Sequence, residues 1–181
     1  MIPALFASVF IVLCLYAAVK DVETLTISNG LNAIIAFLFI PAVIITAPGW
    51  DVAGAHLLAG LAAFAISVLL FSLGVFGGGD AKLLAACAVW IGWMGLLKFL
   101  IFVALIGGVF ALVLIVFRRL TLPESWTAKP WIRRLHDRKG GLPYGVAIGV
   151  GGILMVPELP LYAHAIRPSA VVLQGIQAFM A

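Results

Sequence analysis

Two segments apolar enough to lie in a lipid bilayer are joined by the stretch Gly77-Gly78-Gly79-Asp80-Ala81-Lys82. An ionisable group at membrane depth costs about 2.5 to 3.5 kcal/mol on insertion scales, so it usually faces a polar interior and marks a functional site. Asp80 therefore predicts a function within the membrane region of the protein. We expect its partner to be Asp21, which follows the first apolar segment.

The composition of the 181-residue chain is that of an integral membrane protein. Hydrophobic residues make up 65% of it and charged residues 10%, whereas soluble domains carry about 25% charged residues. The mean hydropathy is +1.24. Apolar stretches run along the whole length without a long polar block, which predicts one domain over residues 1–181. Cys14 and Cys87 lie in apolar segments and form no CxxC pair, so no disulfide framework and no zinc or redox site is expected.

Apolar segments of spanning length predict an all-α, polytopic membrane protein with about six transmembrane helices. The segments are residues 2–19, 32–47, 52–73, 83–97, 99–117 and 142–161. The third is rich in Gly and Ala, which let helices approach closely in lipid, so we expect it to be buried in the bundle. Lys20 follows the first segment and no basic residue precedes it, which favours an uncleaved helix over a signal peptide. The tail 163–181 is expected at the membrane interface.

Basic residues predict the orientation of the chain in the membrane. The basic residues cluster in three places, which are the end of the first segment, the Gly77 turn and the polar stretch 118–141. If these three are cytoplasmic, only Lys98 and Arg167 of the 11 Lys and Arg residues lie outside, as the positive-inside rule favours. Both termini are then outside, and both acids lie at the cytoplasmic edge. Orientation also explains the net charge of +4, so nucleic-acid binding is not expected. The basic stretch is expected to orient the protein or contact anionic lipid, with recognition of an assembly partner as the alternative.

Two carboxyl groups at one depth can share a proton, because like charges a few Å apart cannot both ionise easily in a low dielectric. One can then take a proton from water while the other polarises a peptide carbonyl, as in aspartic proteases. The three glycines leave no side chains, so another backbone, such as a peptide substrate, can approach Asp80. The residues leave two alternatives open. Asp21 can pair with Lys20 at the interface while Asp80 caps a helix, or the acids can form a proton relay.

Other features predict packing rather than chemistry. The glycine turn lacks the G-K-[ST] ending of a phosphate-binding loop, so nucleotide binding is not expected. His56 lies about one turn from Asp51, but two candidate ligands make a poor metal site, and we expect a hydrogen-bonded His. Gly141, Gly145 and Gly149 have the G-x-x-x-G spacing typical of helix packing.

Three short motifs occur in order along the chain. They are Asp21 followed by Ile27-Ser28-Asn29, then Gly77-Gly78-Gly79-Asp80, then Pro143-Tyr144-Gly145. They resemble the D-x5-I-P-N, G-x-G-D and P-[FY]-G elements of type IV prepilin peptidases, which are aspartic peptidases of the GxGD kind. Order and spacing match over about residues 21–149.

The resemblance implies that Asp21 and Asp80 are the catalytic pair. It also implies supporting roles for the motif residues around them, which are Gly77, Gly79, Ile27, Asn29, Pro143 and Gly145. Ser28 stands where the family often has Pro, which alters the turn after Asp21 but removes no catalytic group. The chain lacks the cytoplasmic insert with two CxxC pairs of the bifunctional members. It therefore resembles the short, peptidase-only form associated with Flp-type pili of tight-adherence systems.

The function implied by the resemblance is removal of the leader from a prepilin or pseudopilin precursor at the cytoplasmic face of the inner (plasma) membrane. No metal or other cofactor is expected. The partners are the precursor, the lipid bilayer and, in the alternative given above for the basic stretch, pilus assembly proteins. Archaeal preflagellin peptidases share both aspartates, so a preflagellin substrate stays open. A small transporter or proton channel that uses the two acids as a relay is the alternative from a different class.

Overall fold

The computed structural model describes residues 2–138 and 140–159, and every regular element within them is a helix, which confirms the all-α prediction. In chain order the elements are α1 (Ile2–Thr24), α2 (Asn29–Thr46), α3 (Trp50–Ser72), α4 (Gly78–Ile91), α5 (Trp93–Phe117), α6 (Glu124–Thr127), α7 (Pro130–His136), α8 (Tyr144–Leu154) and a 3₁₀ turn (Val156–Glu158). The predicted interfacial tail and the end of the sixth predicted segment lie outside the described residues.

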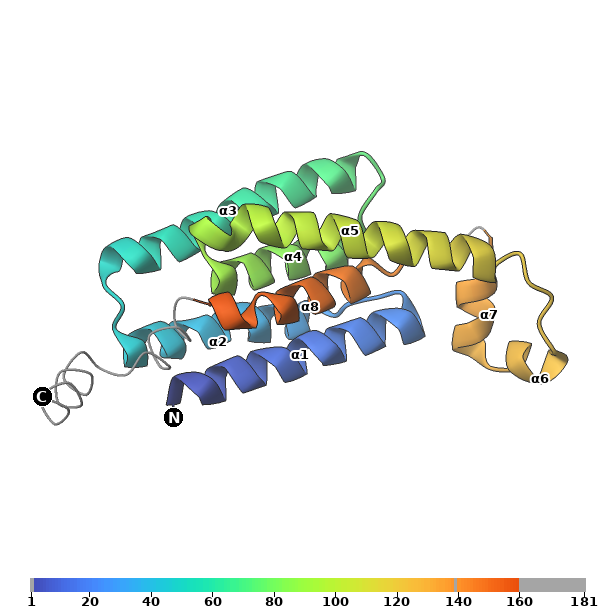
Figure 1. The fold of residues 1–181 in the computed structure, drawn as a ribbon, viewed down its shortest axis with the longest axis horizontal. Helices are drawn as coiled ribbons and strands as arrows, with labels where there is room; N and C mark the ends of the chain where they lie inside the picture. The colour runs from blue at the N-terminus through green and yellow to red at the C-terminus, as the bar shows by residue number, and fades with distance from the viewer. Residues whose placement is uncertain (1, 139, 160–181) are drawn as a thin grey trace, which may run out of the picture.

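Four of these helices, α1, α2, α3 and α5, are long and apolar enough to cross a membrane. The count of about six crossings is not confirmed, because α4 has 14 residues and α8 has 11. At 1.5 Å per residue they are about 21 Å and 17 Å long, short of a hydrocarbon core of about 30 Å. Both short helices lie among the longer ones in the bundle (Figure 1).

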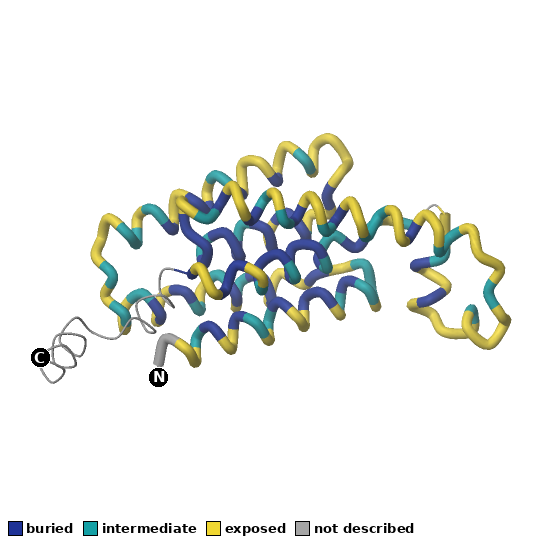
Figure 2. Tube along the Cα trace, in the orientation of Figure 1, coloured by how far each residue is buried: buried dark blue, intermediate teal, exposed yellow. Residues whose placement is uncertain are grey.

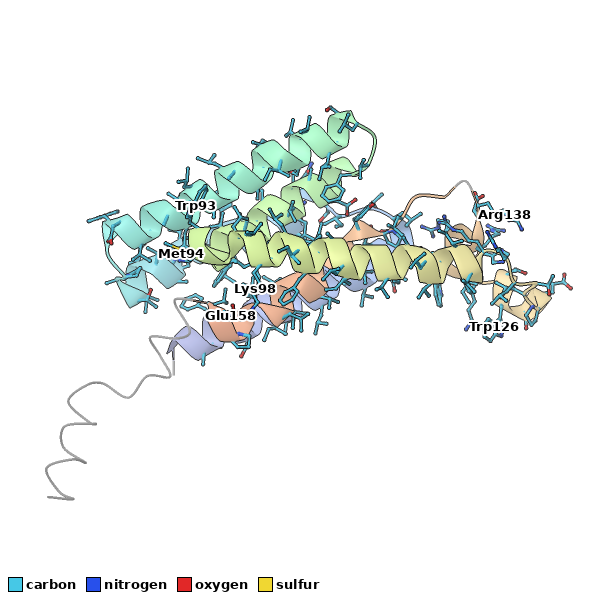
Figure 3. All side chains as sticks on the ribbon, turned by 45° about the horizontal axis from the view of Figure 1, so that its top comes forward. Trp93, Met94, Lys98, Trp126, Arg138 and Glu158 are labelled. Atoms are coloured by element: carbon cyan, nitrogen blue, oxygen red, sulfur yellow. The ribbon has the colours of Figure 1, made fainter. Side chains whose placement is uncertain are left out.

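The boundary predicted between the fourth and fifth segments, at Lys98, is wrong. The chain turns at Gly92, whose φ of 77° lies in the left-handed region that favours glycine. The apolar helix α5 can include Lys98, because the Lys98 ammonium pairs with Glu158 and the side chain stays half exposed. Figure 3 shows Lys98 and Glu158 together, far along the molecule from Trp126 and Arg138.

Helix α4 is the centre of the bundle and packs against α2, α3, α5 and α8. Trp90 near its end is fully buried, and its indole N–H donates to the Ile35 carbonyl of α2 at 2.8 Å. The Trp90 ring also stacks on Phe10 of α1, with ring centres 5.1 Å apart. Burial is accordingly concentrated in the middle of the bundle (Figure 2).

Helix α3 does not have the full burial predicted for it. One stripe of small and polar residues is buried, namely His56, Ala59, Gly60, Ala63 and Ser67, and the other faces are largely exposed. A Cβ on Gly60 would lie 2.3 Å from Val89 Cγ2, so the glycine allows α3 to approach α4 closely. The prediction for His56 is confirmed, since its Nδ1 lies 2.7 Å from the Val89 carbonyl oxygen.

The basic stretch after α5 folds back through α6 and α7 at one end of the molecule (Figure 1). Arg118 holds this return, because its Nε donates to the Leu135 carbonyl and its Nη2 to the Gly141 carbonyl, each at 2.8 Å. Ile132 and Leu135 are buried, whereas most other residues of α6 and α7 are exposed. The return brings the chain to the start of α8, beside the end of α1 and the start of α4.

Candidate active site

Asp21 lies inside α1, not after it as predicted, because the helix continues to Thr24. Its side chain is only 3% exposed. The neighbouring Lys20 pairs with Glu23 at 3.0 Å on the exposed side of the helix. The alternative in which Asp21 pairs with Lys20 at the interface is therefore wrong, and Asp21 points into the bundle.

Asp80 lies in the first turn of α4, as predicted, and is 8% exposed. Its Oδ2 accepts a hydrogen bond of 3.2 Å from the Gly77 N–H, so the carboxyl does cap the helix. Its Oδ1 is buried and has no hydrogen-bond partner among the described residues. Capping thus engages one oxygen of Asp80 and leaves the other for a different role.

The N-terminus of α8 joins the two acids. The Gly145 N–H donates to Asp21 Oδ2 at 2.6 Å, across 124 residues of sequence. Asp80 adjoins this contact, because Ile27 lies against both Gly145 and Gly79, the residue before Asp80. Since the start of a helix carries a partial positive charge, the Gly145 N–H stabilises the charged form of Asp21 against the cost of burying it. Three helices thereby converge on one site.

Glycine is required at two positions around the acids. A Cβ on Gly145 would lie 2.7 Å from Ile27 Cδ1 and 2.8 Å from both Cβ and Oδ2 of Asp21. A Cβ on Gly79 would lie 2.9 Å from the Ile27 carbonyl oxygen. The backbone that approaches Gly79 is thus that of Ile27, while Gly77 and Gly78 stay exposed. Ile27 is a buried wedge between the glycines of two motifs.

The remaining motif residues hold the ends of helices near the acids. Ser28 caps α2 by accepting from the Leu31 N–H at 3.2 Å, and its φ of −69° is one that Pro also adopts. This explains how Ser can replace Pro here. Asn29 accepts from Lys82 Nζ at 2.8 Å, which ties α2 to α4 at the surface. Pro143 is fully buried just before α8.

Two contacts were missed in the sequence. Asn32 is buried in α2 and its Nδ2 donates to the Gly79 carbonyl at 3.0 Å, so it braces the turn that carries Asp80. The sequence signal for this contact was the amide side chain of Asn32 in an otherwise apolar segment. The free thiols of Cys14 and Cys87 lie 4.0 Å apart between α1 and α4. Of the residues described, no three His, Cys, Asp or Glu side chains form a set of metal ligands.

The fold and the site define a polytopic α-helical membrane protein with two buried carboxyl groups beside the start of a third helix. The model of the type IV leader peptidase family matches residues 8–112, which include both acids. The chain belongs to the type IV leader peptidase family. Membership indicates a peptidase of the membrane that acts on prepilin-like substrates. Neither a curated protein nor a solved structure matches the chain.

Proposed function

We propose that the protein is an aspartic endopeptidase that removes the leader from Flp-type prepilin or pseudopilin precursors, with Asp21 and Asp80 as the catalytic pair. The observation that carries this proposal is that both acids are buried beside the start of α8, where the Gly145 N–H donates to Asp21 and Ile27 lies against both Gly145 and Gly79. Burial excludes bulk water, and like charges in such a site favour one proton shared between the two carboxyls. That state contains both the base and the acid that peptide hydrolysis needs.

The hydrogen bonds suggest how the roles are divided. Asp21 accepts the short bond from a helix N-terminus, which stabilises its anion and makes it the general base that takes a proton from water. Asp80 keeps the shared proton, and its unpartnered Oδ1 is the atom that would donate to the scissile carbonyl. Attack of the hydroxide forms a tetrahedral intermediate. As the intermediate collapses, the C–N bond breaks and the proton held by Asp21 passes to the leaving amine. The proton that Asp80 gave to the carbonyl oxygen returns to Asp80 as the C=O bond reforms.

The test is conversion of a precursor to its mature form by variants at matched membrane levels. Asp21→Asn and Asp80→Asn should each reduce cleavage to background, because an amide cannot exchange the proton. Glu23→Gln is the matched control, since Glu23 lies near Asp21 in sequence but pairs with Lys20 on the exposed side. It should cut almost normally, and chelators should have no effect. Full cleavage by either Asn variant would refute the mechanism, and a transporter or channel would leave the precursor's length unchanged.

We also propose that the site faces the cytoplasm of a plasma-membrane protein. One end of the bundle holds the ends of α1 and α5, the start of α4 and the basic stretch that folds back through α6 and α7 (Figure 1). Lys98 lies toward the other end (Figure 3). The positive-inside rule places the Arg-rich end in the cytoplasm. Reporter fusions at Trp50 should read as outside and fusions within residues 124–138 as cytoplasmic. A cytoplasmic signal at Trp50 would contradict this orientation.

A further inference from the structure

A long groove runs between α2 and α3. Both helices pack on α4 but make few contacts with each other, and Figure 1 shows them apart, joined by a short turn. Two cavities, of about 530 and 710 Å³, lie along this groove and share Leu57 as a lining residue. Together they extend from Asn29 at the start of α2 to Pro48 beyond its end. The 18 residues of α2 correspond to about 27 Å, close to the thickness of a bilayer core.

The lining of the groove suits a helix better than a lipid chain. Ala33 and Ala36 of α2 and Ala85 of α4 line it with small side chains, while Leu61 and Phe64 of α3 form an exposed apolar rim. In lipid, small residues allow a second helix to approach closely, and packing of this kind drives helix association. A disordered acyl chain would bind this surface no better than any other apolar surface.

One end of the groove carries an unsatisfied polar group. Asn32 lines the groove and is 4% exposed, and its Oδ1 has no hydrogen-bond partner among the described residues. Such an acceptor is costly where no water is present. The first turn of a helix offers backbone N–H groups without partners, which would satisfy it. Because Asn32 also holds the Gly79 carbonyl, this end adjoins the turn that carries Asp80.

We propose that this groove binds the apolar helix that follows the leader in the precursor, with the start of that helix at Asn32. The inference rests on the proposed function, since a leader before the helix puts the cleavage site at its N-terminal end. Lys82 lines the groove and lies about 200° around α4 from Asp80, at 100° per residue. The scissile segment must therefore cross the start of α4, where Gly77 and Gly78 are exposed and present no side chains. Crossing a helix about 10 Å wide takes about three extended residues, so the precursor is extended between the cleavage site and the start of its helix.

Photo-crosslinking tests where the precursor lies. The probe is a synthetic precursor with a basic leader, a Gly at the cleavage site and an apolar helix of about 20 residues. It is mixed with Asp80→Asn protein that carries p-benzoylphenylalanine in place of Leu61 or Phe64, or in place of Leu105 on the exposed face of α5 as a control. Adducts of protein plus precursor are expected at Leu61 and Phe64 and not at Leu105. Adducts with lipid alone, with a second copy of the chain, or equally at all three positions overturn the proposal.

Filling the groove tests whether the binding is productive. Ala36→Phe and Ala85→Phe should raise KM for the same precursor by about tenfold or more and leave kcat nearly unchanged. Ala104→Phe is the control, since Ala104 is exposed on α5 and does not line the groove. Unchanged KM in both groove variants overturns the proposal, whereas a wild-type protein that does not shorten the precursor overturns the proposed function itself. If a groove variant does not accumulate in the membrane, the photo-crosslinking experiment, in which Ala36 and Ala85 are unchanged, still tests the proposal.

Discussion

Replacing Gly145 with Ala should disable the enzyme with the addition of one methyl group. The new Cβ would lie 2.7 Å from Ile27 Cδ1 and 2.8 Å from Asp21 Oδ2, closer than Cβ atoms normally approach other atoms. Asp21 Cβ also lies 2.8 Å away and is fixed to the backbone of α1, so α8 must move away from α1 to accommodate the methyl group. Overpacking of this kind costs about 1–3 kcal/mol in stability. The movement also lengthens the 2.6 Å hydrogen bond from Gly145 to Asp21.

The effect on catalysis follows from that hydrogen bond. A bond to a charged acceptor contributes about 1.5–3 kcal/mol, and each 1.4 kcal/mol corresponds to about tenfold in rate. If the whole bond is lost in the transition state, kcat should fall by roughly 10- to 150-fold. The measurement is cleavage of a prepilin by purified protein in detergent or liposomes, together with the thermal midpoint of the same samples.

Gly108→Ala is the matched control for this substitution. Gly108 lies within α5, and a Cβ there would have no neighbour within 4 Å. Alanine should therefore raise stability slightly, by about 0.5–1 kcal/mol, and leave cleavage unchanged. Adding Ile27→Val to Gly145→Ala removes Cδ1, the closest of the clashing atoms, and should restore part of the lost stability. A Gly145→Ala variant with wild-type kcat and midpoint would show that α8 does not approach Asp21 as described.

Two further predictions concern the turn before Asp80 and the buried thiols. Gly79→Ala should reduce cleavage strongly, because its Cβ would lie 2.9 Å from the Ile27 carbonyl oxygen. Gly54→Ala in α3 is the control, since its Cβ would have no neighbour within 4 Å, and it should be nearly silent. Equal effects of the two variants in the prepilin assay would contradict the wedge role of Ile27. A double variant with Ala in place of both Cys14 and Cys87 should retain cleavage. Its thermal midpoint should fall, because each small cavity costs about 1 kcal/mol in stability. Loss of cleavage in a stably inserted double variant would give the thiols a function not assigned to them.

The sequence by itself determined the properties that belong to single segments. Apolar stretches of spanning length predicted membrane helices, and an acid in the turn between two such stretches predicted a functional site at Asp80. The spacing of short motifs indicated Asp21 as its partner and Gly145 as a motif residue. These signals are local, because hydropathy and turn chemistry depend on neighbouring residues in the chain.

Only the tertiary structure decided which faces of the helices meet. The helices of the bundle are apolar on nearly every side, so their sequences carry little periodic signal to distinguish a core face from a lipid face. The bond from Gly145 to Asp21, the wedge of Ile27 between two glycines and the groove between α2 and α3 all depend on contacts between distant segments. The turn at Gly92 was missed because Lys98 is tolerated within a helix by its pairing with Glu158. In lipid, helix pairs are selected by close packing and by buried hydrogen bonds, and these exist only once the segments have been brought together.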